Sequence, residues 1–256
     1  MSNQFNSIFK IPDRSLVAQR LTKAFFLRNF SLSTAEKKLL NNTIVAMEIL
    51  GQVNLEKTNI PVVVTETDSY ENILIITCSI NNNQLEKYTD SCTQFIQKYI
   101  AHQVVLVIED GDDFVINVAE KRINQVDNNK LVVDQQFNTS VISKLYKNEQ
   151  TEAFFKALDF NTLDKTNLET TYKSYLQAVV QYQVANSTGS FNKRSQKRTE
   201  EDMANLLAIE NIEVEITSLK SQLSKEKQLN NKVALNVAIQ KKRQHIQRIK
   251  HQLTTI

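Results

Sequence analysis

The scarcity of residues that break helices and form tight turns constrains this chain more than any other feature of its sequence. Only three glycines and two prolines occur in 256 residues. Glycine-rich phosphate-binding loops, collagen-like repeats and turn-dense β-sandwiches all need more of these residues than the chain contains. Long uninterrupted helices are favoured instead, because little in the sequence can end them.

The length and composition are those of a globular protein with more than one compact part. The hydrophobic fraction of 41% and the charged fraction of 23% are typical of a folded chain, and 256 residues exceed the usual size of one domain. The longest apolar runs have the length of strands, well short of the ~20 residues that span a bilayer. We therefore expect no membrane segment. The amino terminus lacks a basic segment followed by an apolar run, so we also expect no signal peptide and a cytoplasmic location. Cys78 and Cys92 are expected to be buried thiols.

The first 150 residues predict a small mixed α/β domain of the α+β class. Helices are predicted over residues 12–26, over 33–51 and over 83–100, because apolar residues recur there at intervals of three and four. In the second of these, Ser33 and Glu36 have the spacing of a capping box. Strand signals rich in Val, Ile and Thr occupy 60–65 and 73–80, and we expect these two strands to be neighbours.

A β-hairpin is predicted after the third of these helices. Two apolar segments, 104–108 and 114–118, flank the dipeptide Asp110-Gly111, which suits a tight turn with positive φ. A further strand is expected over residues 130–133. The sheet is therefore expected to be mostly antiparallel.

From residue 151 onward the strand signals stop. The sequence predicts connecting helices over 151–185, a basic linker over 186–199 and a coiled-coil helical arm over 200–256. Apolar residues in the arm recur at alternating intervals of three and four, which is typical of a coiled coil and predicts oligomerisation, with a homodimer expected. We call these ten residues the seam: Ile209, Ile212, Ile216, Leu219, Leu223, Leu235, Ile239, Ile246, Ile249 and Leu253.

The seam changes its phase between Leu223 and Leu235, whose separation of twelve residues is not a multiple of seven. Either one continuous helix rotates its apolar face there, or the helix folds back near residues 228–231 as a hairpin whose arms bury each other. The absence of glycine and proline favours a continuous helix through Lys225–Asn236. If a turn is present, Asn230 and Asn231 are its expected site, because asparagine is a poor helix former.

Charge is distributed unevenly along the chain. Residues 1–160 carry 16 basic and 19 acidic side chains, whereas residues 161–256 carry 15 basic and 9 acidic ones. A basic arm suggests an anionic partner, because lysine and arginine side chains that neutralise phosphates release counterions and bind nucleic acid without sequence preference. The same residues alternatively solvate a helix or pair with acids of a partner protein. The predicted nucleic-acid-binding residues are Lys193, Arg194, Lys197, Arg198, Lys241, Lys242, Arg243, Arg248 and Lys250.

Motifs for catalysis and cofactor binding are largely missing. Serine nucleophile elbows, Walker loops and dinucleotide fingerprints all need glycines at fixed positions that this chain lacks, which excludes hydrolases, NTPases and dehydrogenases of those kinds. The three histidines, His102, His245 and His251, do not have the spacing of a helical metal pair. No metal site, cofactor or catalytic residue is predicted in the preferred interpretation.

One acidic cluster supports an alternative. The acids between Glu109 and Asp113 are followed by Glu120 and Lys121, and metal-dependent nucleases use two carboxylates to hold a divalent ion and a lysine to orient water. Because Glu120 and Lys121 are adjacent on a predicted strand, however, they point to opposite faces, and a solvated hairpin tip also explains the acids. A nuclease with carboxylates around Asp110 to Glu120 is therefore the second hypothesis.

Four segments of the chain, in the same order, resemble landmarks of an uncharacterised bacterial domain-of-unknown-function family. They are LSTAEKKLL at 32–40, VAEKRIN at 118–124, TNLETTY at 166–172 and KEKQLNNKVALN at 225–236. Members are similar in length and often encoded beside helicase and DNA methyltransferase genes in phage-defence or restriction-type loci. The resemblance implies a process, DNA processing or phage defence, without assigning a role within it. Together with the helical arm it leads us to expect a non-enzymatic accessory or scaffold subunit of such a bacterial assembly, whose arm docks a helicase or methyltransferase partner and contacts DNA. Asn230 and Asn231 depart from a more basic family pattern.

Overall fold

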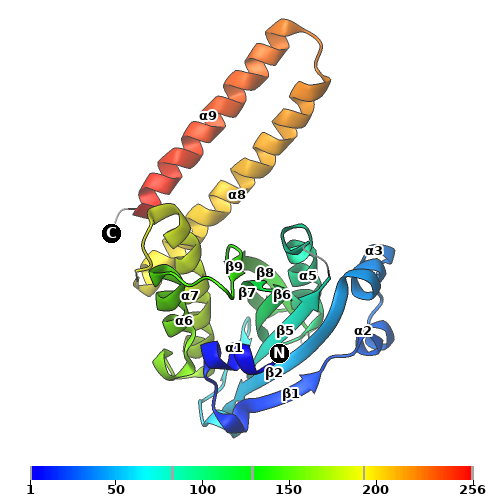
Figure 1. Ribbon diagram of the computed structural model, residues 1–256, viewed down its shortest axis with the longest axis vertical. Helices are drawn as coiled ribbons and strands as arrows, with labels where there is room; N and C mark the ends of the chain where they lie inside the picture. The colour runs from blue at the N-terminus through cyan, green and yellow to red at the C-terminus, as the bar shows by residue number, and fades with distance from the viewer. Residues whose placement is uncertain (1, 82–83, 128–129, 193, 255–256) are drawn as a thin grey trace. The chain divides into compact units, whose positions relative to one another are not determined.

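The computed structural model describes residues 2–81, 84–127, 130–192 and 194–254. The chain folds as two compact units, Met1–Gln183 and Val184–Ile256 (Figure 1). The first contains a mixed sheet with helices, and the second is almost entirely helical. A mixed chain with a mostly antiparallel sheet, as predicted from the sequence, is confirmed.

The main sheet of the first unit has one parallel step. Its strands follow the order β1-β2-β5-β6-β7-β8, and short β9 pairs with β7. Among the described strands only β5 and β6 are parallel neighbours, joined by the helix α5 (Leu85–Tyr99), as a parallel pair requires a crossover. The strands are β1 Leu16–Arg20, β2 Ile44–Asn54, β5 Asn72–Ile80, β6 Gln103–Asp110, β7 Asp113–Ile123, β8 Leu131–Asn138 and β9 Ile142–Ser143.

Shorter elements surround this sheet. A small separate sheet pairs β3 (Val63–Val64) with β4 (Ser69–Tyr70). The remaining helices of the first unit include one stretch of π-helix, η2, and two 3₁₀ turns. They are α1 Ser2–Phe9, η1 Asp13–Ser15, α2 Lys23–Asn29, α3 Thr34–Lys38, η2 Leu39–Thr43, α4 Leu55–Thr58, α6 Glu149–Leu158, η3 Phe160–Thr162 and the start of α7, Leu168–Thr188.

The predicted helix over residues 12–26 is wrong for most of its length. Pro12 precedes a single 3₁₀ turn, and the chain then enters β1, where Ala18 adopts a positive φ of 48°. A helix begins only after Thr22, whose side chain accepts a hydrogen bond from Phe25 N at 3.2 Å. Pairing of β1 with β2 therefore prevails over the local helical spacing.

The helix predicted over residues 33–51 is right at its start and wrong after Thr43. The capping box of Ser33 and Glu36 is present, but the backbone becomes strand β2 at Ile44. Register shifts in the pairing with β5 interrupt the alternation of β2, so Ile44 and Met47, three residues apart, both join one core cluster. A bulged strand thus imitates helical periodicity.

The strand predicted over residues 60–65 is also corrected. Only Val63–Val64 is extended, and it pairs with β4 in the small sheet. The neighbours of β5 are β2 and β6, so 60–65 and 73–80 are not adjacent strands.

Other sequence predictions for this unit are confirmed. Helix α5 covers residues 85–99 of the predicted 83–100, whose first residue lies outside the described residues. Strands β6 and β7 form the expected hairpin, with Gly111 at a φ of 63°. Strand β8 covers the predicted 130–133 segment apart from Lys130 and extends it to Asn138.

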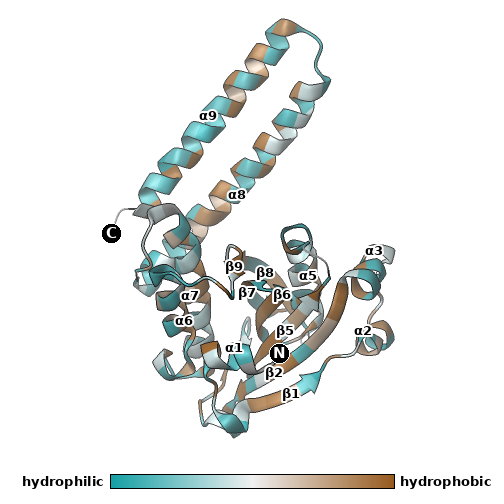
Figure 2. Cartoon of the chain, in the orientation of Figure 1, coloured by the Kyte–Doolittle hydropathy of each residue, from teal (hydrophilic) through white to brown (hydrophobic). Residues whose placement is uncertain are grey.

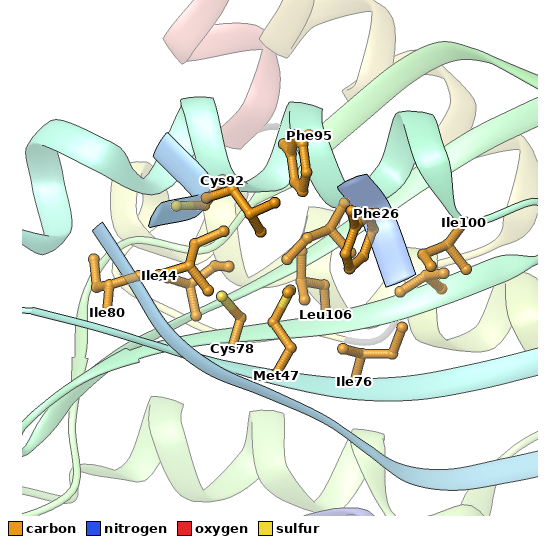
Figure 3. Close-up of a cluster of buried hydrophobic side chains, with 14 of the residues drawn as sticks. Phe26, Ile44, Met47, Ile76, Cys78, Ile80, Cys92, Phe95, Ile100 and Leu106 are labelled. Atoms are coloured by element: carbon orange, nitrogen blue, oxygen red, sulfur yellow. The ribbon is translucent and has the colours of Figure 1, made fainter. Parts of the chain in front are cut away.

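One core cluster of the first unit lies between α5 and the sheet (Figure 3). Phe95 and Ile96 of α5 meet Leu106 of β6 and Ile76 of β5 in this cluster, and all four are nearly or completely buried. Burial of one large apolar side chain contributes about 1.5–3 kcal/mol, so the amphipathic spacing of α5 explains its position. Cys78 and Cys92 are buried in the same cluster as free thiols, as predicted.

The second unit is a helical hairpin, and the predicted continuous helix is wrong. Helix α8 (Gln196–Lys225) ends three residues before α9 (Leu229–Thr254) begins, and the two pack against each other (Figure 1). The turn lies at Glu226–Gln228, whereas Asn230 and Asn231 belong to the first turn of α9. Within the described residues, no helix has both the length and the apolar character needed to cross a membrane.

Candidate interface on the helical hairpin

The two helices of the hairpin bury most of the seam between them. Figure 2 shows apolar residues recurring along both helices among hydrophilic ones. Leu219 and Leu223 are partly buried against the cluster of apolar residues between the two helices, and Leu235 is half-buried. Because one chain satisfies its own seam, the seam no longer requires a second copy, and the homodimer stays a prediction. The buried seam residues are Ile209, Ile212, Ile216, Ile239, Ile246, Ile249 and Leu253.

The turn between the helices is closed by one acidic side chain. The Glu226 carboxylate accepts hydrogen bonds from Lys227 N at 2.7 Å and from Gln228 N at 2.8 Å, and Asn231 Nδ2 donates to it at 3.2 Å. These bonds, led by that from Gln228 N, lower the pKa of Glu226. The carboxylate thus supplies the acceptors that let the chain reverse without glycine or proline.

A buried ion cluster closes the other end of the hairpin. Asp202 of α8 is completely buried, and the Arg194 guanidinium donates to both of its carboxylate oxygens at 3.0 and 3.1 Å. Arg198 lies 3.3 Å from the same carboxylate. Both arginines also reach the last turn of α9, where Arg194 donates to Leu253 O at 2.7 Å and Arg198 donates to Gln252 O at 2.5 Å. We call Arg194, Arg198 and Asp202 the hairpin clasp.

The clasp changes the interpretation of the predicted basic linker. Arg194 and Arg198 were expected on an exposed linker, but helix α8 begins at Gln196, so Lys197 and Arg198 are helical. Arginine donors bound to the last carbonyls of a helix satisfy its unpaired acceptors and complement its dipole. Burial raises the pKa of Asp202 even though both guanidinium groups lower it. Lys197 is exposed, and Lys193 lies outside the described residues.

Helix α9 carries a row of basic residues, several of which face solvent. Its 26 residues include six lysines and arginines and no acid. Lys241 and Arg248 are exposed and seven residues apart, so they lie on one side of the helix. Spacings of eleven and seven residues align Lys232, Arg243 and Lys250 along a second line.

The neighbouring helix neutralises little of this charge. Lys242 forms an ion pair with Glu215 of α8. Within the described parts of the chain, no ion pair is formed by Lys241, Arg243 or Arg248. Most of the α9 cations therefore remain available to an anion outside the hairpin.

The carboxylates of the nuclease alternative do not meet at one point, because Glu120 lies far along β7 from the acids at the β6–β7 turn. Glu109 is buried with Lys144, whose Nζ lies 2.8 Å from its carboxylate, and accepts a hydrogen bond from Ser79 Oγ at 2.8 Å. Asp110 accepts from Gln84 N at 2.8 Å beside the start of α5. Glu120 lies seven residues along β7 from Asp113, a separation of roughly 24 Å. In the described residues, no group of three or more potential metal ligands occurs.

Lys121 has a structural environment of its own. Its side chain is almost completely buried, and Nζ donates to Ile100 O at 3.0 Å and to His102 O at 2.7 Å. These carbonyls lie at and just after the C-terminal end of α5. Burial lowers the pKa of Lys121 to about 7. The side chain therefore fastens the end of α5 to β7.

Sequence reasoning missed Asp202 as the centre of the clasp. The signal was present as the i, i+4 spacing of Arg198 and Asp202 and as a helix-capping serine, Ser195, whose side chain accepts from Arg198 N. Helix α8 carries several other acids, however, so spacing alone does not single out the one that the fold buries.

Together these features define a class of protein: an α+β unit followed by a helical hairpin with one basic, acid-free helix. The chain belongs to the family described as domain of unknown function DUF4391, whose model matches residues 9–246. The predicted membership of an uncharacterised domain-of-unknown-function family is thereby confirmed. No curated protein and no solved structure matches the chain.

Proposed function

We propose that this protein is a non-enzymatic accessory or scaffold subunit of a bacterial DNA-processing or anti-phage defence assembly, and that its helical hairpin contacts nucleic acid and docks a partner protein. The observation that carries the proposal is the composition of α9, with six basic residues and no acid in 26 residues. The hairpin turns its apolar seam inward and leaves these cations outward.

The expected mode of nucleic-acid contact follows from the placement of the cations. Lys241 and Arg248 lie about 10 Å apart along the helix axis, so two such residues reach successive phosphates rather than one. Contacts of this kind are independent of sequence and weaken steeply as salt concentration rises. Arg194 and Arg198 are not assigned to this surface, because the clasp holds both.

The docking part of the proposal rests on the resemblance described above. A family often encoded beside helicase and methyltransferase genes suggests one of these enzymes as the partner. A hairpin closed at both ends by hydrogen bonds is a preformed element that loses little conformational entropy when it docks.

The nucleic-acid part is tested by charge reversal on α9. The double variant Lys241→Glu with Arg248→Glu should bind duplex DNA at least about tenfold more weakly, and its log–log salt slope should fall by roughly two. Fluorescence anisotropy of labelled duplex DNA between about 50 and 200 mM salt measures both quantities.

A matched control separates the surface from the net charge. Lys37→Glu with Lys147→Glu changes the charge by the same amount at two exposed positions of the first unit and should leave the affinity within about twofold. Equal losses for both double variants would reject α9 as the contact surface. The DNA should also remain uncut when Mg²⁺ or Mn²⁺ is added, and cleavage lost in Asp113→Ala or Glu120→Ala would favour the nuclease instead.

A further inference from the structure

A groove of about 630 Å³ runs beside strand β8 in the first unit. One side is formed by the end of α5 and the residues around it, including Lys98, Tyr99 and Phe30. The other side is formed by six consecutive residues of β8, 131–136. Because six consecutive residues line it, the groove follows β8 along this stretch.

The outer edge of β8, beside this groove, has unpaired backbone groups. Strand β8 ends the order of the main sheet, and within the described residues no strand pairs with its outer edge. Such an edge presents a row of backbone donors and acceptors to any extended segment that approaches it. Asn124 N donates to Lys130 O at 2.9 Å, one residue beyond the paired ends of β7 and β8, so one backbone hydrogen bond fixes Lys130 beside the start of β8.

The sequence along this edge is complementary to itself in the antiparallel direction. It reads Lys-Leu-Val-Val-Asp over residues 130–134. When two copies run antiparallel with Val132 on the twofold axis, each Lys130 faces the other copy's Asp134, and each Leu131 faces the other copy's Val133. Opposite charges and apolar residues that face each other directly both stabilise a strand pair.

We propose that a second copy of this chain occupies the groove, pairing β8 with β8 antiparallel about Val132 and extending the main sheet across a twofold axis. An isologous contact of this kind uses the same residues on both copies and closes as a dimer. Asp134 would oppose edge pairing with an unrelated strand, because an isolated edge charge discourages it. In the dimer the same residue meets a cation and favours the correct partner.

The charged side chains remain available for these contacts. The side chain of Lys130 is 67% exposed and forms an ion pair with Asp127 three residues away, a surface pair that contributes little. Asp134 lies 2.7 Å from Arg122, and its side chain is 41% exposed. A carboxylate accepts several hydrogen bonds at once, so Asp134 can bind Arg122 of its own chain and Lys130 of the second copy at the same time.

This inference goes beyond the proposed function, because the dimer surface lies on the first unit and uses none of the α9 cations. It also replaces the seam as the reason to expect a dimer. The failure of one proposal therefore leaves the other standing.

The proposal is tested by reversing each charge separately. Lys130→Asp places two acids opposite each other in both symmetric contacts, and Asp134→Lys places two cations there. Each single variant should form dimers at least about tenfold more weakly than the natural protein in sedimentation equilibrium. The melting temperatures of the separate variants show whether each is folded.

Mixing the two variants gives the decisive result. A chain with Lys130→Asp and a chain with Asp134→Lys are complementary at both contacts, so the mixture should form dimers more tightly than either variant does alone. The double variant Lys130→Asp with Asp134→Lys should also dimerise by itself. A natural protein that is monomeric at about 100 µM, or dimers that ignore both reversals, would overturn the proposal.

A second measurement does not depend on the charges. Val132→Cys places one thiol of each copy beside the twofold axis, whereas Cys78 and Cys92 are buried. Mild oxidation of this variant should give a covalent dimer, while Val126→Cys, at an exposed position off the axis, should not. Equal cross-linking of the two variants, or none in Val132→Cys, would also overturn the proposal.

Discussion

Single buried charges have defined structural tasks in this protein, and Lys121 shows this most clearly. Its ammonium group donates hydrogen bonds to two carbonyl oxygens at the end of α5 rather than to a carboxylate. Burial lowers its pKa to about 7, so near neutral pH the folded protein holds this proton far less tightly than the unfolded chain does.

The first prediction at this scale concerns pH. The unfolded chain binds more protons at this site between pH 7 and about 10, so the contribution of Lys121 to the free energy of unfolding rises with pH across that window. Relative to Lys121→Met, the natural protein should gain about 2 kcal/mol between pH 7 and pH 9. Urea unfolding monitored by tyrosine fluorescence measures the difference, with Lys147→Met as the exposed control. Parallel pH profiles for natural protein and Lys121→Met would contradict it.

The second prediction at this scale concerns the clasp. Asp202→Ala leaves two partly buried guanidinium groups without their common carboxylate, and breaking a buried ion pair typically costs about 3–5 kcal/mol. We expect faster amide hydrogen exchange at the base of the hairpin, in the first turns of α8 and the last turns of α9. Glu201→Ala removes a half-exposed neighbouring acid and should change exchange little. The same protection in both variants would show that the clasp does not hold the hairpin.

At the scale of elements, the hairpin shows how one turn redirects a long helical segment. A three-residue turn closed by Glu226 replaces the continuous helix that the absence of glycine and proline favours. The gain is burial of seven seam residues within one chain. At roughly 1.5–3 kcal/mol for each large apolar side chain, this burial exceeds the cost of breaking one helix.

The prediction at this scale is a distance. Spin labels at Ser218 and Gln240, both exposed, lie on facing arms of the hairpin and should be within about 20 Å. A continuous helix separates the same positions by about 33 Å. Pulsed electron resonance on labelled protein diluted with unlabelled protein reports the distance within one chain. A dominant distance above about 30 Å would restore the continuous rod.

At the scale of the whole molecule, the two units carry different kinds of surface. The first unit holds most of the acids and an open sheet edge, whereas the second holds the acid-free basic helix. Each set of variants is therefore a control for the other. Reversals at Lys130 and Asp134 address the association of two copies, and reversals at Lys241 and Arg248 address nucleic acid.

Local spacing predicts the features whose sequence pattern repeats within about four positions. These are the capping box at Ser33, the turn at Gly111, the amphipathic helix α5 and the identity of the seam. In each case the pattern that predicts the feature lies in neighbouring residues, although the groups that bury the seam and α5 are distant along the chain.

Features that depend on partners distant in sequence appear only in the folded chain. Residues Ile44–Asn54 form a strand because β1 and β5 pair with them. The sequence pattern does not predict this strand, because bulges interrupt its alternation of apolar and polar residues. Arg194 and Arg198 became part of the clasp because the hairpin returns the end of α9 to them. Lys121 and Asp202 look like ordinary surface charges in the sequence, and only the fold removes them from water, because burial is a property of the packed chain.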